Sequence, residues 1–389
     1  MNNLKLTATT FFGLEEVLAD ELLQLGARDI VKGNRSVTFT GDKGFMYKAN
    51  YNLHTALRIL WQIAFQKNIY KAEHLYKAIA AIDWTQYMDI SNTIRIDVTG
   101  QTKYFKNTRF IALKAKDAIV DQFRQKYNSR PDISLKNPDL RIVLHFKDDK
   151  LDILLDSSGE PLHKRGYRTM TNIAPLNEVL AAGIVALSDW RGNENLLDPM
   201  CGSGTILIEA AMYAMQIPAG INRQQYAFQK WKDYDPELFE LIKESSLKKI
   251  RELPAGVKLI GYDKAPSAVE KAIQNVKNAN LEEFITIKQA DFFRTIRPKK
   301  PTQLLFNPPY DERLSIDTQS FYKKIGDTLK NNYPDTIAWM LVGNLQALKY
   351  VGLRPSKRIK LFNGKIEARL VKYKLYSGSK KTKPATKSS

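Results

Sequence analysis

The stretch "LLFNPPYDERL", residues 304–314, combines residue types that could take part in chemistry. Three apolar residues typical of a buried strand are followed by Asn307, Pro308, Pro309 and Tyr310. Each proline fixes φ and lacks an N–H donor, so the tetrapeptide can neither extend a strand nor begin the interior of a helix. It would present an amide side chain, stiffened carbonyl groups and an aromatic ring at a strand end. A substrate-binding turn and an ordinary polar turn both remain open.

A second candidate site is "NLLDPMCGSGTILIEAA", residues 195–211, which predicts a strand, a glycine-containing loop and a helix. Glycines at 202 and 204 let the backbone approach a ligand closely. The loop lacks the Lys-Ser or Lys-Thr of phosphate loops and the GxGxxG spacing of dinucleotide sites. We therefore expect another nucleotide-like cofactor, bound by the loop residues Asp198, Pro199, Cys201, Gly202, Ser203, Gly204 and Thr205.

Two further acids follow predicted strands of the same region. Asp263 ends "VKLIGYD", where a carboxylate can accept hydrogen bonds from both ribose hydroxyls. Asp291 follows "FITIKQA" and could face the exocyclic amine of a purine, although capping a helix explains it nearly as well. Because the carboxyl ends of neighbouring parallel strands share one edge, Asp198, Asp263 and Asp291 predict one ligand crevice.

The elements that must position these residues begin at Asn195, where short apolar strands alternate with helices. This pattern predicts a mostly parallel sheet covered on both faces. Strands are predicted near 195–198, 257–262, 284–288, 303–306 and 336–342. Asn363-Gly364 lies between two alternating runs and predicts a hairpin with a type I′ turn. The lysine-containing tail, 377–389, predicts disorder.

The first half of the chain also predicts α/β structure. Strands are predicted over 3–9, 35–41, 57–65 and 93–100 and twice within 140–159, and helices over 14–25, 71–81 and 107–126. The last helix has an apolar side formed by Ile111, Ala115, Ala118, Ile119 and Phe123. Its basic residues, those leading into it and those of "LHKRGYRTM" are candidate RNA contacts: Lys103, Lys106, Arg109, Lys114, Lys116, Lys164, Arg165 and Arg168. A solvated charged face is an equally good explanation of the helix.

Composition narrows the classes of partner. The 389 residues, 43% of them hydrophobic, are enough for two or three domains, and the net charge of +19 favours a polyanion such as nucleic acid. No apolar run of about 18 residues and no signal-peptide order is present, so we expect a cytoplasmic protein without a membrane segment. One cysteine and four scattered histidines predict neither a disulfide framework nor a metal site. The oligomeric state is not indicated.

"DPMCGSGT" followed later by "NPPY" resembles the class I S-adenosylmethionine-dependent methyltransferases that modify exocyclic amino groups. The resemblance implies a Rossmann-like, mostly parallel seven-stranded sheet and S-adenosylmethionine as cofactor. An amine conjugated to a purine ring is a poor nucleophile. Acceptors on both of its N–H bonds, here the Asn307 oxygen and the Pro308 carbonyl, would align its lone pair with the methyl carbon. Pro309 would stiffen the turn, and Tyr310 would stack on the base.

Cys201 invites comparison with the nucleophile of cytosine-C5 methylation. It lies within the predicted cofactor loop, away from where a base would enter, so a small packing residue is the better explanation.

The amino-terminal half resembles a small ferredoxin-like domain followed by a THUMP domain. "HKRGYRTMTNIAPLNEVLAAGIV" resembles the linking segment of the 23S ribosomal RNA guanine-N2 methyltransferase L family, which adds Asn177 and Glu178 as candidate cofactor contacts. We therefore expect domains at 1–55, 56–160 and 161–376 and a tail at 377–389. The resemblance implies methylation of a guanine N2 amine in 23S ribosomal RNA or a large-subunit precursor.

Alternatives to this function stay open. They are a transfer RNA guanine-N2 methyltransferase, a DNA adenine-N6 methyltransferase and an RNA-binding assembly factor without turnover. The chain ends soon after the first catalytic domain, so no second, fused activity is expected. The aromatic residues Phe228, Trp231 and Tyr234 could form a wall near the site, but core packing is at least as good an explanation.

Overall fold

A computed structural model describes residues 3–169, 176–309 and 317–377. The chain forms two compact units. The N-terminal unit contains residues 1–166 together with 216–251, and the C-terminal unit contains residues 167–215 and 252–389. Each unit is built around its own sheet.

The N-terminal unit has one continuous eight-stranded sheet in the order β2-β3-β1-β4-β8-β7-β5-β6. Its strands are β1 (Leu4–Thr9), β2 (Arg28–Gly33), β3 (Ser36–Gly41), β4 (Arg58–Gln66), β5 (Thr93–Gln101), β6 (Asp132–Ile133), β7 (Leu140–Lys147) and β8 (Lys150–Asp156). β4 pairs with β1 on one side and with β8 on the other. The predicted ferredoxin-like and THUMP regions therefore share backbone hydrogen bonds across a single sheet.

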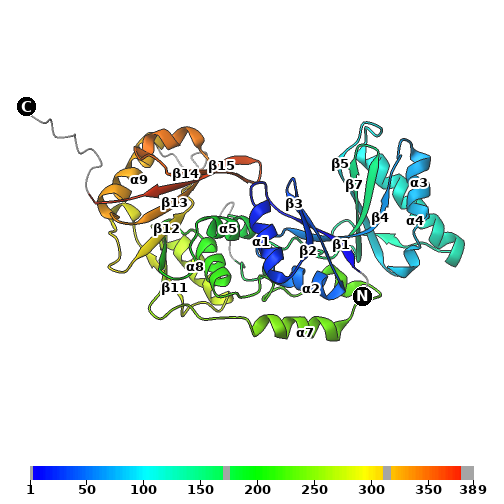
Figure 1. Ribbon diagram of the computed structural model, residues 1–389, viewed down its shortest axis with the longest axis horizontal. Helices are drawn as coiled ribbons and strands as arrows, with labels where there is room; N and C mark the ends of the chain where they lie inside the picture. The colour runs from blue at the N-terminus through cyan, green and yellow to red at the C-terminus, as the bar shows by residue number, and fades with distance from the viewer. Residues whose placement is uncertain (1–2, 170–175, 310–316, 378–389) are drawn as a thin grey trace, which may run out of the picture. The chain divides into compact units, whose positions relative to one another are not determined.

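The helices of this unit lie against its sheet (Figure 1), and their apolar side chains are buried in one core with it. They are α1 (Glu15–Leu25), α2 (Lys43–Asn52), α3 (Ala72–Ala80) and α4 (Thr108–Tyr127). α1 ends at Gly26, whose φ of 96° is the left-handed conformation that glycine adopts at low cost. The apolar side predicted for α4 is confirmed, since all five of its residues are buried. The strands and helices predicted here are confirmed, while β2, β6 and α2 were not expected from the sequence.

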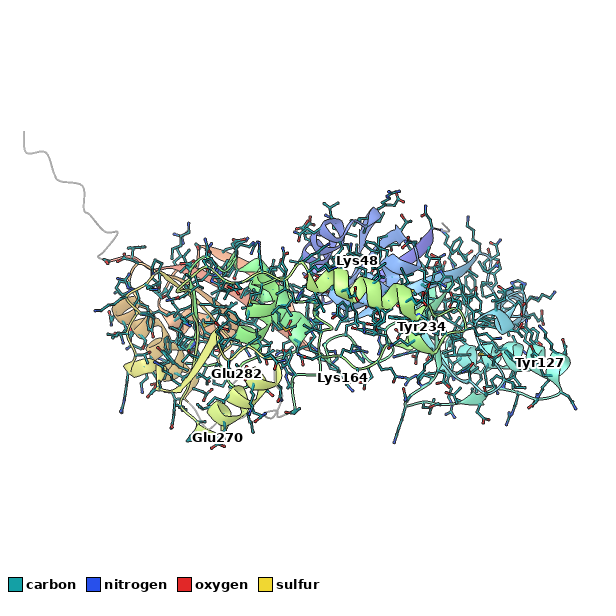
Figure 2. All side chains as sticks on the ribbon, turned by 90° about the horizontal axis from the view of Figure 1, so that it is seen from below. Lys48, Tyr127, Lys164, Tyr234, Glu270 and Glu282 are labelled. Carbon is teal, nitrogen blue, oxygen red and sulfur yellow. The ribbon has the colours of Figure 1, made fainter. Side chains whose placement is uncertain are left out.

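Residues 216–251 belong to the N-terminal unit although they lie between parts of the C-terminal unit in the sequence. They contain the short helix η2 (Ala227–Lys230) and α7 (Pro236–Leu247). Phe228 stacks on Tyr47 with 4.3 Å between ring centroids, and Tyr234, labelled in Figure 2, meets the same ring edge-on at 6.0 Å. Trp231 lies 5.9 Å from Trp61. These aromatic residues form core, so the core-packing alternative is confirmed and the wall near the site is wrong.

The C-terminal unit has a seven-stranded sheet in the order β11-β10-β9-β12-β13-β15-β14 (Figure 1). Its strands are β9 (Asn195–Asp198), β10 (Leu259–Asp263), β11 (Ile285–Gln289), β12 (Thr302–Phe306), β13 (Ile337–Val342), β14 (Lys357–Asn363) and β15 (Ile366–Lys374). The first five are parallel to one another, and β15 is antiparallel to β13 and β14. This confirms the five predicted strands and the mostly parallel, Rossmann-like sheet.

The predicted hairpin is present, but its turn differs from the prediction. Asn363 pairs with Ile366 and remains in β14, so Gly364 and Lys365 form the two-residue loop. A type I′ turn needs positive φ at both central residues, whereas Gly364 has a φ of 64° and Lys365 does not share that conformation. Glycine therefore occupies the first central position instead of the second, and the type I′ prediction is wrong.

The helices of the C-terminal unit are α5 (Glu178–Leu187), α6 (Thr205–Ala214), α8 (Pro266–Asn278) and α9 (Thr318–Asn332). α9 packs with the short helix η5 (Leu345–Val351) on one face of the sheet. α6 approaches β10 closely because Gly261 has no side chain: a Cβ there would lie 2.7 Å from the Leu207 side chain. Further short helices among the described residues are η1 (Trp84–Gln86) and η3 (Phe292–Arg294).

Within the described ranges, no helix has the length and apolar character needed to cross a bilayer. The same ranges contain no group of three or more histidine, cysteine or acidic side chains arranged to hold a metal ion.

Candidate functional site

The candidate site lies at the carboxyl edge of the parallel strands. Gly261 of β10 is level with Asp198 of β9, and Leu304 of β12 is level with Leu197. Asp263 and Asn307 therefore each stand two residues, or about 7 Å, farther along the strand direction than Asp198, on its two neighbouring strands. β9 and β12 flank the point where the strand order reverses, where open α/β sheets bind ligands. The predicted convergence of Asp198 and Asp263 on one crevice agrees with this register.

The loop after β9 is fixed by bonds from its own backbone. The Cys201 N–H donates to the Tyr262 carbonyl at 2.8 Å, and the Gly202 N–H donates to Asp263 Oδ2 at 3.0 Å. Gly202 and Gly204 have φ values of 54° and 79°, which a side chain would strain. Gly204 precedes α6 and has no side chain to cap it, so the first amides of the helix are available to a ligand.

Asp198 is a buried acid, only 1% exposed. Its Oδ1 accepts the Met200 N–H at 3.1 Å. Burial raises the pKa of the Asp198 carboxyl well above its ordinary value, and the neighbouring Asp263 charge raises it further, while the Met200 hydrogen bond opposes this. A positively charged ligand would therefore stabilise the ionised form of the Asp198 carboxyl group more than an uncharged ligand would.

The residues of this edge fit the expected cofactor. Within the described part of the chain, no basic side chain lies within ion-pair distance of Asp198 or Asp263. Asp263 accepts one backbone N–H on each oxygen, from Gly202 and from Ala265, and each oxygen keeps a second lone pair for a hydroxyl. These groups suit S-adenosylmethionine. The Asp263 oxygens can accept its ribose hydroxyls, the two acids can face its positive charges, and the first amides of α6 can bind its carboxylate.

Cys201 packs against the sheet under this loop and is 7% exposed. Burial raises the pKa of its thiol well above the ordinary value, and the charges of Asp198 and Asp263 raise it further. The thiol therefore stays protonated, and a protonated thiol is a poor nucleophile. This agrees with the packing role that the sequence suggested.

Arg168, predicted as an RNA contact, is instead an internal connector of the C-terminal unit. Its side chain is 10% exposed. Nη2 donates to Thr205 Oγ1 at 2.8 Å and to the Leu176 carbonyl at 2.7 Å, while Nη1 lies 3.4 Å from Glu178 Oε1. The predicted phosphate contact does not fit a guanidinium engaged in this way. The sequence could not show this, because an arginine in a basic segment has the same neighbours in the sequence whether it is buried or exposed.

Glu178 and Asn177 lie at the start of α5. The Asn177 side chain accepts the Val179 N–H at 3.0 Å and so caps the helix, and Glu178 is 3% exposed. Through Arg168, Glu178 is connected to Thr205, the first residue of α6. Their predicted contact with the cofactor remains a prediction.

Sequence reasoning missed three residues that hold the loop after β9 and the segments beside it. Asn275 on α8 donates to the Ser203 carbonyl at 3.0 Å, and Asn278 donates to the Tyr167 carbonyl at 3.0 Å. The Tyr167 hydroxyl donates to Glu209 Oε1 at 2.8 Å. Asn275 is fully buried on the helix side that also buries Ala268 and Ala272, so a polar residue at a core position was the available signal.

Asp291 caps η3 by accepting the Phe293 N–H at 3.1 Å. Its side chain is 40% exposed, and Arg294 lies 4.0 Å away. The capping explanation is confirmed, and a contact with a purine remains a prediction.

The turn after β12 begins with Asn307, which is half-buried, Pro308, which is buried, and Pro309, which is exposed. β12 itself is buried throughout, as the apolar run predicted. Tyr310 lies outside the described residues, so its predicted stacking role remains a prediction.

The candidate RNA contacts of α4 differ in their surroundings. Lys103, Lys106 and Arg109 are exposed where the chain enters α4, and Lys103 lines an open cavity of about 830 Å³ together with Phe105, Thr108 and Lys147. Lys103 also lies 3.4 Å from Asp148 and 5.2 Å from the Tyr104 ring. Lys114 and Lys116 are less exposed: the first lies 5.0 Å from the Tyr76 ring, and the second is 2.9 Å from Asp117. Lys106 and Arg109, which are exposed and have no acidic partner among the described residues, are thus better placed to meet a phosphate than Lys114 and Lys116.

The two remaining basic candidates are neighbours in the sequence, but one is exposed and the other is buried. Lys164, labelled in Figure 2, is exposed and pairs with Glu160 at 2.5 Å. Arg165 is 2% exposed and donates to the carbonyls of Leu162 and His54. A buried guanidinium bonded to backbone carbonyls does not fit the predicted phosphate contact.

Comparison with known proteins agrees with this arrangement. Residues 165–372 match the family model "RMKL-like, methyltransferase domain", residues 5–60 match the RlmL ferredoxin-like domain, and residues 70–156 match the THUMP domain. The first match alone covers more than half of the chain.

Individual relatives extend over nearly the whole chain. A ribosomal RNA large subunit methyltransferase K/L from Marinomonas sp. is 35% identical over 384 residues, which cover 96% of this chain and 53% of the relative. The protein slr0064 of Synechocystis sp. is 34% identical and covers 95% of this chain and 96% of its own length. The chain spans about half the length of the K/L relatives that it matches.

Among solved structures, SMU.472 complexed with SAH has a TM-score of 0.86 and 28% identity, covering 97% of this chain and 100% of the other. Its bound SAH agrees with the acids and glycines placed above. The chain belongs to the RMKL-like family of S-adenosylmethionine-dependent methyltransferases, with ferredoxin-like and THUMP domains before the methyltransferase domain.

Proposed function

We propose that the chain transfers a methyl group from S-adenosylmethionine to the exocyclic N2 amine of a guanine in 23S ribosomal RNA. The observation that carries the proposal is the position of Asn307 and Pro308, directly past β12 and beside the strand that ends in Asp198. Acceptors for an amine are thus next to the crevice of the cofactor. The names of the K/L relatives and the THUMP domain support ribosomal RNA as the substrate class.

The bound cofactor supplies an electrophilic methyl carbon. The chain's own residues then have to orient the amine. Asn307 Oδ1 and the Pro308 carbonyl accept its two N–H bonds, which favours a pyramidal nitrogen whose lone pair is directed at that carbon. The proline pair fixes this geometry before the substrate arrives, so little reorganisation is needed during transfer. The amine becomes acidic once it is methylated, so a strong general base is not required.

RNA binding is assigned by the proposal to the THUMP region, residues 56–160. Lys103, Lys106 and Arg109 provide exposed positive charge at the start of α4, next to the cavity lined by Phe105 and Lys147. Phosphate contacts of this kind add affinity and position the substrate without reading its sequence.

Nucleoside mass spectrometry tests the function. Ribosomal RNA, transfer RNA and DNA are compared between cells with the gene, without it, and without it but carrying Asn307→Ala. We expect N2-methylguanosine in 23S ribosomal RNA to fall when the gene is absent and to return only with the unmodified protein. If N2-methylguanosine falls in transfer RNA instead, the substrate is transfer RNA. If N6-methyladenine falls in DNA, the substrate is DNA. No change in any pool would leave a non-catalytic RNA-binding role.

A further inference from the structure

The hairpin β14–β15 of the C-terminal unit is strongly basic, although no sequence pattern connected it with RNA. Between Arg354 and Lys374 the chain has eight basic residues and one acid, Glu367; the basic ones are Arg354, Lys357, Arg358, Lys360, Lys365, Arg369, Lys372 and Lys374. These 21 residues contribute seven of the nineteen net positive charges of the whole protein. β14 forms the edge of the sheet (Figure 1).

Most of these cations lack acidic partners. Glu367 accepts ion pairs from Lys360 at 2.8 Å and from Arg369 at 2.9 Å. Within the described residues, the other six basic side chains of the hairpin segment have no carboxylate within ion-pair distance. Their charge is therefore directed at solvent rather than neutralised within the unit.

The pairing of the strands brings like charges together. Lys357 is directly opposite Lys372, and Lys360 is directly opposite Arg369. Like charges at opposed positions destabilise a sheet. The buried Trp339 offsets part of the first repulsion, since the two lysine ammonium groups lie 5.9 and 5.1 Å from its ring. Glu367, which pairs with both Lys360 and Arg369, offsets part of the second. Such close like charges lower the stability of the protein without a ligand. A polyanionic ligand would remove this repulsion, so the arrangement is suited to binding one.

The hairpin also extends toward the reaction edge. Val342, the last residue of β13, pairs with Arg369, so Ile366 to Ala368 continue about 10 Å past that strand end. β13 is parallel to β12, and its carboxyl end shares the edge that carries Asp198 and Asn307. The tip, with Lys365, therefore projects on the side from which a substrate reaches the site.

Lysines on an edge strand also prevent sheets from joining. That explanation covers β14, but it does not require Arg369, Lys372 and Lys374, which lie on the inner strand β15. We propose that the β14–β15 hairpin is a second RNA-binding surface, which binds the phosphate backbone near the target nucleotide. The inference rests on the proposed RNA substrate and adds a contact made by the methyltransferase domain itself.

The test uses the full chain and protein-free 23S ribosomal RNA. The hairpin variant is Lys357→Gln, Arg358→Gln and Lys365→Gln; all three side chains are exposed. The matched control is Lys277→Gln, Lys299→Gln and Lys300→Gln, which removes the same charge from exposed positions at the opposite, amino edge of the sheet. Filter binding gives RNA affinity from low to high salt, calorimetry gives SAH affinity, and tritium transfer from S-adenosylmethionine gives activity.

The hairpin variant should bind RNA about tenfold more weakly at low salt, and its dependence of log affinity on log salt should be shallower by about two to three. The control should stay within about twofold of the unmodified protein, and both variants should bind SAH normally. Equal RNA affinity of the two variants would overturn the inference, even if methyl transfer occurs. If the hairpin variant is weakened but the unmodified protein methylates no RNA, the proposed function fails and the surface stands.

Discussion

Arg168 and Lys357 show two opposite uses of positive charge in the same unit. Arg168 is nine-tenths buried, and its guanidinium joins Thr205 of the cofactor loop, the Leu176 carbonyl and Glu178. Lys357 is exposed on an edge strand opposite another lysine. A buried cation acts through fixed geometry, which salt hardly screens, whereas an exposed cation acts through a field that salt weakens. Salt dependence and stability therefore separate the two uses experimentally.

The largest effect is expected at a residue that acts through fixed geometry alone. Asn307→Ala removes one amine acceptor, and the methyl-transfer rate in single turnover should fall by about 10²- to 10³-fold, the size seen when one preorganised polar group is lost. RNA affinity and its salt dependence should not change.

The control for this variant is Asn193→Ala, an exposed position in the loop before β9. It should retain full activity. SAH affinity of Asn307→Ala should stay within about twofold of the unmodified protein. A large loss of SAH affinity would place Asn307 in the cofactor pocket and not at the amine.

The second effect concerns the buried connector. Arg168→Met removes the ion pair with the buried Glu178 carboxylate, and loss of one member of such a buried pair costs about 3–5 kcal/mol of unfolding free energy. SAH affinity should also fall, because Thr205 begins the helix next to the cofactor loop. Urea unfolding and calorimetry measure both, and neither loss should depend on salt.

Arg168→Met combined with Glu178→Gln separates charge from packing. The double variant removes the uncompensated charge and should regain part of the lost stability. If it is no more stable than Arg168→Met alone, the ion pair is not what the arginine contributes. Weaker RNA binding in both variants would argue for the phosphate contact that the burial of Arg168 disfavours.

The sequence predicted most where chemistry acts through the backbone. The candidate site was predicted from three local features: two glycines with positive φ, an acid at the end of each of two strands, and two prolines after a third strand. The register of the strands brings all three strand ends to one edge of the sheet. The strands themselves followed from apolar runs that are now buried. Local residue types were sufficient here because each one does its work within a few residues of its own position.

The sequence predicted least where a role depends on distant partners. Arg165 and Arg168 resemble Lys164 in sequence, yet burial separates them, and nothing local to "HKRGYR" reveals the carbonyls that accept their hydrogen bonds. Residues 216–251 pack in the N-terminal unit for a similar reason, since the partner rings Tyr47 and Trp61 come from far earlier in the chain. Periodicity gives the buried face of an element, but not the element that covers it.

A smaller effect is expected from the exposed cations of the THUMP domain. Lys103→Gln, Lys106→Gln and Arg109→Gln should weaken binding of protein-free 23S ribosomal RNA by about tenfold at low salt and flatten its salt dependence. The rate at saturating RNA should be unchanged. Fluorescence anisotropy with labelled RNA measures the affinity.

Lys114→Gln with Lys116→Gln is the comparison within the same helix. These lysines are less exposed and are engaged by the Tyr76 ring and by Asp117, whereas in the first variant only Lys103 has an acidic partner, Asp148 at 3.4 Å; the variant of Lys114 and Lys116 should therefore lose less affinity. A loss of affinity as large as that of the first variant would show that a lysine with such local partners still binds RNA. Exposure would then not distinguish the lysines that contact RNA from those that do not.

The smallest effect isolates the buried acid of the cofactor crevice. Burial, and then the charge of Asp263, raise the pKa of the Asp198 carboxyl in the folded protein. The folded state therefore holds this proton more tightly than the unfolded state does. The resulting stability is complete below the unfolded pKa of about 3.9 and is lost as pH rises through the folded pKa. The Asp198→Asn side chain does not ionise, so this variant does not lose that stability as pH rises. We therefore compare melting temperatures without cofactor. The melting temperature of the variant should exceed that of the unmodified protein by a margin that grows by roughly 2–4 °C from low to neutral pH.

The cofactor reverses this preference, because a positive ligand favours the ionised acid. Affinity of the unmodified protein for S-adenosylmethionine should rise with pH, and binding should release protons, which calorimetry in two buffers of different ionisation enthalpy detects. Asp198→Asn should bind more weakly, with a flat pH profile. Parallel pH profiles for the two proteins would show that Asp198 is already ionised without cofactor. The crevice would then be a preformed anionic site, and Asp198 would resemble the exposed charges of the hairpin in being ionised before its ligand arrives.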